Sequence, residues 1–297
     1  MQKKALIIGS AVADITIRVD HLPSLEEDVN PYSQTMRLGG CAYNVSNMFR
    51  LLQVPYLLCA PVGKGIYGDF VRKQLLQHQI MPAFESGEDN GCCYCIVDRE
   101  GRRTFMSVHG AEYRFKKEWF DELDAEEFQL GYCCGFEMEE ESGEYILDFF
   151  RRHPDLPFCY APGPRIMNVD RKRQEDLLDL HPLLHLNLRE ARSYLNRTEQ
   201  EDDEIRICAG KLAKRTGNTV IITDGENGCL CIENQKVIRV PALHLDNVVD
   251  STGAGDSHIG TYLACRMKGM DTEEALKHAA RISSEVCLVN GPVLERI

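Results

Sequence analysis

The segment from Asp250 to Asp256 predicts chemistry more clearly than any other part of the sequence. Gly253 and Gly255, separated by Ala254, allow a tight turn in which several N–H groups point the same way. The residues that follow are helical in pattern, and the first N–H groups of a helix lack intrahelical partners and lie at the positive end of its dipole. The turn is therefore predicted to bind an oxyanion or a phosphate through main-chain amides, without a lysine.

Asp256 stands at the mouth of this predicted anion site. A carboxylate at that place would repel a bound phosphate, so phosphate binding does not explain it. A general base that takes a proton from an attacking hydroxyl does explain it, and such a base contributes about 10²- to 10⁴-fold to a rate. Aspartate also commonly caps a helix, and the spacing alone leaves both interpretations open.

Polar residues at other predicted strand and helix ends could bind a ligand. Asp14 follows the first predicted strand, where open α/β sheets bind their ligands, although a turn residue would look the same. Asn44 begins a predicted helix and could offer an amide donor and acceptor to a polyol, or simply cap that helix. Asn187 and Glu190 are three residues apart at a strand-to-helix junction, so both can face one cleft.

Four motifs in this order resemble those of the ribokinase (PfkB) family of carbohydrate kinases. They are GGCAYN at 39–44, NLRE at 187–190, TDGENG at 223–228 and DSTGAGD at 250–256. Ser251 departs from the threonine that is commoner in the last motif. The motifs span nearly the whole chain, which makes the resemblance far more specific than any single motif.

The resemblance implies an α/β fold, a ribokinase-like three-layer sandwich with a mostly parallel central sheet and a small β-sheet lid. It implies ATP-dependent phosphorylation of a hydroxymethyl group on a small sugar-like substrate, with Asp256 as the base. The other residues to which it gives roles fall into two groups. The catalytic turn and substrate site comprise Gly253, Ala254, Gly255, Asp14, Gly39, Gly40 and Asn44, and the nucleotide site comprises Asn187, Glu190, Thr223, Gly225 and Gly228.

The resemblance also implies metal ions. Glu190 would organise Mg²⁺ through water, together with Asn187 and the phosphates of ATP, and carboxylates with water are ligands that suit this ion. A monovalent cation, K⁺, is implied near Asp250 and Thr252. Small residues in the last predicted helix could admit an adenine ring or could equally serve helix packing, namely Ala279, Ala280 and Ser283.

The elements that must position these residues alternate between strands and helices, which predicts a mostly parallel sheet covered on both faces. The predicted strands are 5–8, 56–60, 130–134, 157–160, 183–186 and 219–223, followed by a hairpin of 229–232 and 237–240. The predicted helices are 44–53, 68–79, 141–152, one from Arg189, 255–268 and 272–289. Segments 15–38 and 91–112 alternate apolar and polar residues and are expected to pair as an inserted β lid, leaving 1–14, 39–90 and 113–297 as the main domain.

Composition narrows the class of protein further. A net charge of −12 over 297 residues argues against a nucleic-acid-binding surface. No apolar stretch approaches the ~20 residues that span a bilayer, and Asp14 interrupts the only signal-like run, so we expect a cytoplasmic protein without a membrane partner. The 13 cysteines lie mostly in strand-like segments without zinc-site spacing and are interpreted as structural thiols.

Other functions remain open at this stage. A nucleoside kinase of the adenosine or pseudouridine type would share the fold, and apolar lid-region residues tilt slightly toward a ligand that carries a base, namely Tyr32, Met36, Tyr43, Cys93, Cys95 and Met106. An oxidoreductase is disfavoured because GSAVAD at 9–14 lacks the three-glycine fingerprint. A non-catalytic regulator is disfavoured because Asp256 and both glycines are retained.

Two expectations concern the lid. Its sheet is expected to form a homodimer interface, because a small sheet with an apolar face needs a partner. Arg102 and Arg103 lie beside the lid hairpin and are expected on a solvated face, with contact to a phosphorylated sugar as the alternative.

Overall fold

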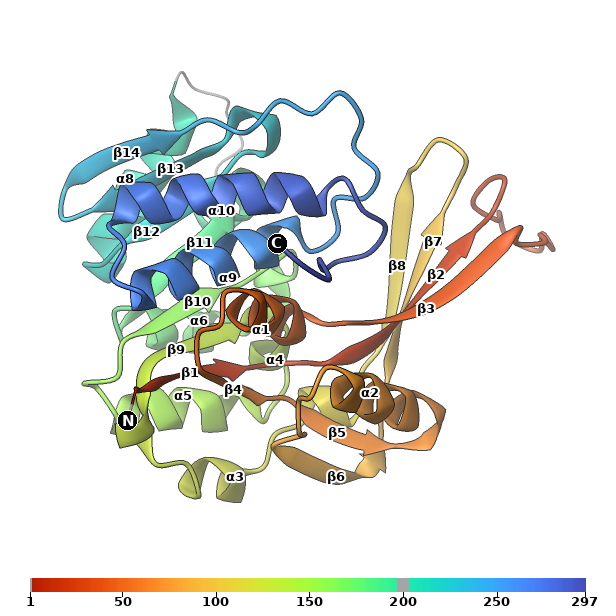
Figure 1. Cartoon of the computed structure of the whole chain (residues 1–297), viewed down its shortest axis with the longest axis horizontal. Helices are drawn as coiled ribbons and strands as arrows, with labels where there is room; N and C mark the ends of the chain where they lie inside the picture. Colours follow the sequence, from red (N-terminus) through yellow and green to blue (C-terminus); the bar gives the residue numbers. More distant parts are fainter. Residues whose placement is uncertain (1, 197–202) are drawn as a thin grey trace.

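The main sheet of the computed structural model, which describes residues 2–196 and 203–297, has eight strands (Figure 1). The order is β14-β13-β12-β11-β10-β9-β1-β4, and the six strands from β12 to β4 are parallel. The parallel strands are β1 (Lys4–Ile8), β4 (Tyr56–Cys59), β9 (Phe128–Cys134), β10 (Phe158–Ala161), β11 (Leu183–Asn187) and β12 (Val220–Thr223). The hairpin of β13 (Cys229–Glu233) and β14 (Lys236–Val240) adds two antiparallel strands.

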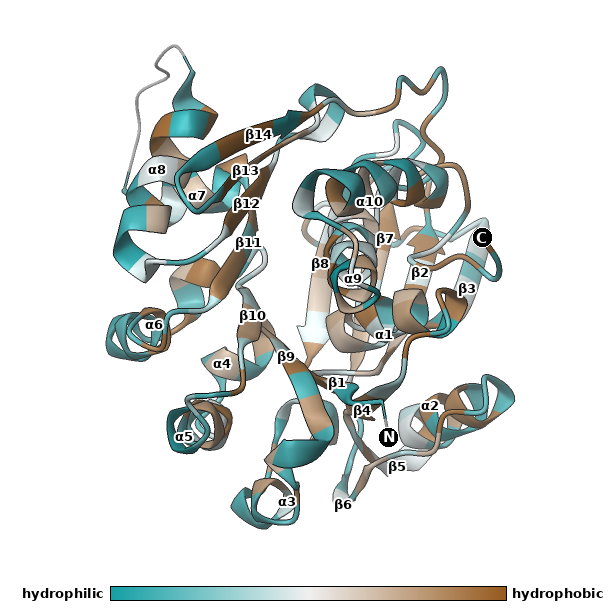
Figure 2. Ribbon diagram, turned by 60° about the vertical axis from the view of Figure 1, so that its left-hand side comes forward, coloured by the Kyte–Doolittle hydropathy of each residue, from teal (hydrophilic) through white to brown (hydrophobic). Residues whose placement is uncertain are grey.

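Both faces of this sheet are buried, which explains why its strands are almost continuously apolar. Along β1, Ala5 and Ile7 face one core while Leu6 and Ile8 face the other. Figure 2 shows the two helical layers on opposite sides of the sheet. One layer contains α1 (Cys41–Leu51), α9 (Ala254–Met267) and α10 (Thr272–Val286), and the other contains α4 (Gly135–Glu139), α5 (Gly143–Arg152), α6 (Arg171–Leu178), α7 (Leu188–Tyr194) and α8 (Glu204–Thr216). The predicted three-layer α/β fold is confirmed.

A separate four-stranded sheet stands beside the main sheet in Figure 1. Its order is β3 (Ser33–Gly39), β2 (Val12–Arg18), β7 (Cys92–Val97) and β8 (Arg103–Val108), so the two alternating segments of the sequence do pair with each other. We call this sheet the lid sheet. Because β2 begins at Val12 and β3 ends at Gly39, both Asp14 and Gly39 lie on it.

Smaller elements complete the described chain. Strands β5 (Pro61–Lys64) and β6 (Phe84–Asp89) pair next to α2 (Gly65–Gln77), and α3 (Lys117–Asp121) is a short helix. Among the helices of residues 2–196 and 203–297, none combines the length and the apolar composition that a membrane span requires. All 13 cysteines are free thiols, and most of them are buried.

The element boundaries differ from the sequence expectations at particular places. Helix α1 begins at Cys41 rather than Asn44, with Gly40 at its N-cap. The sequence patterns assigned no element to α3, α6, α8 or β6. Helix α6 is strongly polar and buries only three of its residues, so hydrophobic periodicity gives little sign of it.

Candidate functional site

Two of the predicted site residues lie at the carboxyl ends of neighbouring parallel strands. Asn187 ends β11 and Thr223 ends β12, and these two residues are directly paired across the sheet. Asp256, in the first turn of α9, also lies near this edge. The negative charge of Asp256 raises the pKa of Glu190 in α7, so the two carboxyl groups are close to each other. This is the edge at which open α/β sheets bind ligands.

A cavity of about 410 Å³ opens beside β12 and the N-terminal turn of α9. Three predicted nucleotide-site residues line it. So do two residues of the turn at 253–255, which we call the glycine turn, and two of the small residues that could admit an adenine ring. These seven are Thr223, Gly225, Gly228, Ala254, Gly255, Ala280 and Ser283. Ala279 is fully buried and does not line the cavity. The sequence interpretation missed the connection after β14, which contributes Ala242, Leu243, His244, Leu245 and Val248.

The glycine turn, residues 253–255, begins in a backbone conformation that favours glycine. Gly253 has a φ of 77°, and a Cβ there would collide with the carbonyl oxygen of Pro292. Gly255 is exposed, and a Cβ there would meet open space. The amides of Gly255 and Asp256 belong to the first turn of α9, where a helix supplies no acceptor of its own. The turn therefore presents amide donors beside the cavity.

Asp256 and Asn44 are joined by a hydrogen bond in which Asn44 Nδ2 donates to Asp256 Oδ2 over 2.8 Å. Burial raises the pKa of Asp256 to about 6, against the opposing effect of hydrogen bonds from Asn44 and Cys41. Asn44 Oδ1 is buried and accepts no hydrogen bond from any residue that the structure describes. A buried acceptor without a hydrogen bond carries an uncompensated desolvation penalty. A ligand hydroxyl that donated to Asn44 Oδ1 would offset that penalty. The role of Cys41 had no signal in the sequence.

Asp14 of the lid sheet lies close to the carboxylates of Asp256 and Asp250. Burial raises its pKa to about 7, and the negative charges of Asp256 and Asp250 add to this effect. Its carboxylate lies over Gly39, where any Cβ would collide with it. Gly40 (φ 99°) makes its close approach to the backbone of Ser10, so Gly40 is required by a main-chain contact, whereas Gly39 leaves room for the Asp14 carboxylate.

Asn187 and Glu190 form a reciprocal cap at the start of α7. The Glu190 carboxylate accepts from the Asn187 amide (3.0 Å) and from Asn187 Nδ2 (2.6 Å), while Asn187 Oδ1 accepts from the Glu190 amide (2.8 Å). Burial raises the pKa of Glu190 to about 7, and repulsion by Asp256 contributes. The three carboxyl groups of Asp14, Glu190 and Asp256 therefore all have raised pKa values.

The electrostatics decide which metal ions fit. A divalent cation near Glu190 would relieve repulsion among these carboxyl groups. Among the described residues no cluster of three or more His, Cys, Asp or Glu could hold a metal by itself, so the site suits an ion held largely by water and phosphate. Asp250 and Thr252 do not fit as ligands of an added K⁺, because Arg103 Nη1 donates to Asp250 Oδ1 (2.7 Å) and to Thr252 Oγ1 (2.9 Å).

Arg103 thus lies against the turn that leads into α9 rather than on a solvated face, which corrects the sequence expectation. Its neighbour Arg102 is solvent-exposed, as expected, and pairs with Asp98 within the hairpin (2.7 Å). Alternation along β8 sends successive side chains to opposite faces, but it could not say which face meets the main domain.

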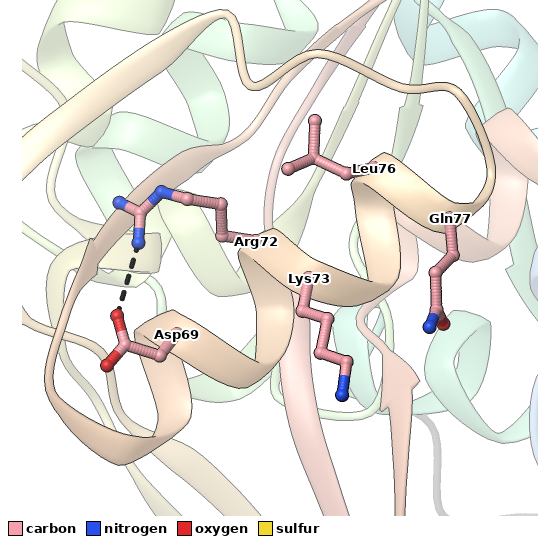
Figure 3. A pocket seen from close by; sticks show the side chains of 5 residues that line it. All are labelled: Asp69, Arg72, Lys73, Leu76 and Gln77. Carbon is pink, nitrogen blue, oxygen red and sulfur yellow. Dashed lines mark hydrogen bonds and ion pairs between the residues drawn. The ribbon is translucent and has the colours of Figure 1, made fainter.

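A second hollow, of about 460 Å³, lies along α2 (Figure 3). Only residues of this helix line it: Asp69, Arg72, Lys73, Leu76 and Gln77. Asp69 and Arg72 face each other across a 3.5 Å ion pair, and Arg72 Nη2 also donates to the carbonyl of Gly63 (3.2 Å). None of the predicted site residues is there, and we assign it no function.

Comparison with known proteins agrees with this geometry. The family profile described as "pfkB family carbohydrate kinase" matches residues 2–295. The chain is similar to the protein named "Uncharacterized sugar kinase YegV" of Escherichia coli strain K12, with 26% identity over 286 residues, 96% of this chain and 88% of that protein. It is also similar to adenosine kinase 2 of Arabidopsis thaliana, with 25% identity over 293 residues, 91% of this chain and 84% of that protein. The solved structure of Arabidopsis thaliana ribokinase with ribose and ATP has the same fold, with a TM-score of 0.80, 19% identity, and 98% and 94% of the two chains covered.

Proposed function

Because the chain belongs to the pfkB family of carbohydrate kinases, we propose that it transfers the γ-phosphoryl group of ATP to a hydroxymethyl group of a small, uncharged, sugar-like substrate. One observation carries this proposal. The Asp256 carboxylate, hydrogen-bonded to Asn44, lies in the first turn of α9, two residues of which line the cavity proposed for the nucleotide.

Each part of the site has a task in this reaction. ATP would occupy the cavity between β12 and α10, with its terminal phosphates directed at the glycine turn. The amides of that turn would stabilise the negative charge on the transferring phosphoryl group, which is the main requirement of phosphoryl transfer. Asp256 would accept the proton of the acceptor hydroxyl, and its raised pKa of about 6 suits a base that works near neutral pH.

The residues present also fit a role for Mg²⁺. Glu190, with Asn187 beside it, would bind water molecules of the hydrated ion. Asp256 is close enough to Glu190 for its negative charge to raise the pKa of Glu190. When bound, Mg²⁺ would neutralise charge on the β- and γ-phosphates. The carboxylate of Glu190 is fixed by its own cap, so its orientation does not depend on the ligand.

The charge of the acceptor site favours an uncharged, hydroxyl-rich substrate. Asp14 and Asp256 are both acidic and already repel each other, so a phosphorylated sugar would meet further repulsion. Hydroxyl groups can donate to Asp14 and to the unpaired Asn44 Oδ1.

A nucleoside is the second candidate acceptor, and one observation favours it. Phe105 of β8 is 55% exposed and lies on the same face of the lid sheet as Asp14. Asp14 and Thr16 are two residues apart on β2 and share that face, and Thr16, Cys95 and Phe105 are successive cross-strand partners. An exposed aromatic ring beside a hydroxyl-binding site could stack on a base.

A panel of acceptors tests the proposed function. Pentoses, hexoses, hexose phosphates and nucleosides are incubated with MgATP, and ADP release is followed together with the mass of the product. We expect an unphosphorylated sugar or nucleoside to gain one phosphate. Phosphorylation of hexose phosphates alone, or ADP release that no acceptor stimulates, would contradict the proposal.

The two glycines of the turn should respond differently to substitution. Gly253→Ala places a Cβ at positive φ against Pro292 and should destabilise the fold by about 1–3 kcal/mol. Gly255→Ala meets no protein atom within 4 Å and should leave the melting temperature unchanged or slightly raised. Its methyl group would instead crowd the phosphates, lowering kcat/KM for ATP about tenfold or more. Thermal melting and steady-state kinetics separate the two effects, and wild-type kinetics for Gly255→Ala would contradict the assignment of the turn.

A homodimer through the lid sheet is also part of the proposal. The face opposite Asp14 is mostly apolar, and Met36, Met106 and Val108 are exposed on it. A second copy of this chain would cover that face. Light scattering at micromolar concentration should give twice the chain mass, and Met106→Glu should reduce it to one. A monomeric wild-type protein would contradict this interface.

A further inference from the structure

The side chain of Asp250 organises the turn that leads into α9. Its Oδ1 accepts from the amide of Thr252 (2.8 Å), and its Oδ2 accepts from the amide of Gly291 (3.3 Å) in the C-terminal segment. This carboxylate is half-buried and lies close enough to Asp14 to raise the pKa of Asp14. A buried carboxylate in acidic surroundings needs a compensating positive charge.

Arg103 supplies that charge from the lid sheet. It lies on the same face of the sheet as Asp14. Asp14 and Arg18 are four residues apart on β2 and therefore share a face, and Arg18, Val97 and Arg103 are successive cross-strand partners. A single nitrogen, Nη1, bridges Asp250 Oδ1 and Thr252 Oγ1, and the side chains of Arg103 and Asp250 are only 22% and 16% exposed. The guanidinium thus lies between Asp250 and Thr252, where the family resemblance implies a monovalent cation.

The contact reaches the catalytic turn through the chain itself. Thr252 directly precedes Gly253, whose positive φ starts the turn, and α9 begins at the next residue. A second arginine on this face, Arg37, donates to the carbonyl of Asn290, beside the Gly291 amide that binds Asp250. The lid sheet is therefore attached to both segments that hold the Asp250 carboxylate.

We propose that Arg103 is the resident cation of this turn: its guanidinium takes the place of a monovalent metal ion and holds Asp250 and Thr252 so that the amides of Gly255 and Asp256 face the nucleotide. Arg103 is thus a positioning residue for the reaction, and this inference rests on the proposed kinase function. Because the charge comes from the lid sheet, the enzyme does not need K⁺, and removal of the arginine should create a need for it.

The experiment compares wild type with Arg103→Met and with Arg102→Met, its matched control on the same hairpin. Turnover is measured in KCl, NaCl and choline chloride at one ionic strength of about 0.1 M, where screening is equal. We expect wild type and Arg102→Met to change less than about twofold between salts. Arg103→Met should lose roughly 10²-fold in choline chloride, as misplaced catalytic groups do, and KCl should restore a large part of that loss.

Thermal melting in the same salts gives a readout that does not require turnover. An ion that binds only the folded state raises the melting temperature of the protein. The melting temperature of Arg103→Met should therefore be higher in KCl than in choline chloride, whereas that of wild type should be the same in both salts. If no acceptor is phosphorylated, the proposed function fails, whereas this comparison still tests the cation. Arg103→Lys, which keeps the charge, should remain insensitive to K⁺ and provides a second variant if Arg103→Met does not fold.

Three results would overturn the inference. The first is a wild-type enzyme that K⁺ activates about tenfold or stabilises against heat. The second is an Arg103→Met variant that keeps wild-type turnover in choline chloride. The third is a variant whose lost activity and melting temperature are indifferent to K⁺, since Arg103 would then act on a ligand or on lid packing.

Discussion

Asp256→Asn is expected to lower kcat by about 10²- to 10⁴-fold, because the amide cannot accept the proton of the attacking hydroxyl. The new amide side chain can still accept a hydrogen bond from Asn44, so the turn and the nucleotide cavity should remain intact. ATP affinity, measured by calorimetry in the presence of Mg²⁺, should therefore change little or improve slightly. The loss should appear in kcat at saturating concentrations of both substrates.

A matched control for this variant is Asp246→Asn. Asp246 is an aspartate in the connection after β14, its side chain is 93% exposed, and it carries the same formal charge. It should keep wild-type kcat, which separates the loss of the base from the loss of a negative charge near the nucleotide. A kcat for Asp256→Asn within a few-fold of wild type would remove the base assignment.

Asp14→Asn is expected to raise the KM for the acceptor by roughly 10²-fold and to leave the KM for ATP nearly unchanged. The reason is that Asp14 lies on the lid sheet close to Asp256, where we place the acceptor, whereas no residue of that sheet lines the cavity proposed for the nucleotide. A hydrogen bond from a neutral donor to a carboxylate contributes about 1.5–3 kcal/mol. A 10²-fold change corresponds to about 2.7 kcal/mol, so the loss of one such bond accounts for the expected change. A rise in the KM for ATP alone would show that the acceptor site is misplaced.

The same substitution should stabilise the ligand-free protein. Because the pKa of Asp14 is raised to about 7, the folded state keeps this proton at pH values where the unfolded state has lost it. Stability is therefore lost as the pH rises from about 4 to about 7, and each pKa unit is worth about 1.4 kcal/mol. Asp14→Asn removes this cost, so its gain in melting temperature should be absent at pH 4 and largest above pH 7. Asp20→Asn, an exposed position just after β2, should show no such gain, and an equal gain in both variants would contradict the argument.

The fold was largely predictable because its strands are short apolar runs between helical patterns. β1, β4, β11 and β12 are each buried on both faces and therefore stand out in the sequence. Elements that bury little, such as α6, gave no such signal. Asn187 and Thr223 lie at the strand ends where the sequence pattern placed them and are direct neighbours, whereas Asn44 lies inside α1 and not at its start.

Contacts between the lid sheet and the main domain could not be predicted in the same way. Alternation fixes which lid residues share a face, but it does not determine what that face meets. Hence Arg103 was expected in solvent and instead binds Asp250, and the role of Cys41 beside Asp256 was not foreseen. The raised pKa of Asp14 depends on charges from distant parts of the chain, Asp250 and Asp256, and so could not be inferred from its neighbours in sequence.

A crystal structure of the chain with MgADP and the acceptor found in the panel tests the catalytic geometry most directly. The accepting hydroxyl oxygen should lie within about 2.6–3.2 Å of an Asp256 carboxylate oxygen, and the β-phosphate should face the amides of Gly255 and Asp256. An acceptor bound with its reactive hydroxyl away from Asp256, or a nucleotide whose phosphates avoid that turn, would contradict the proposed mechanism.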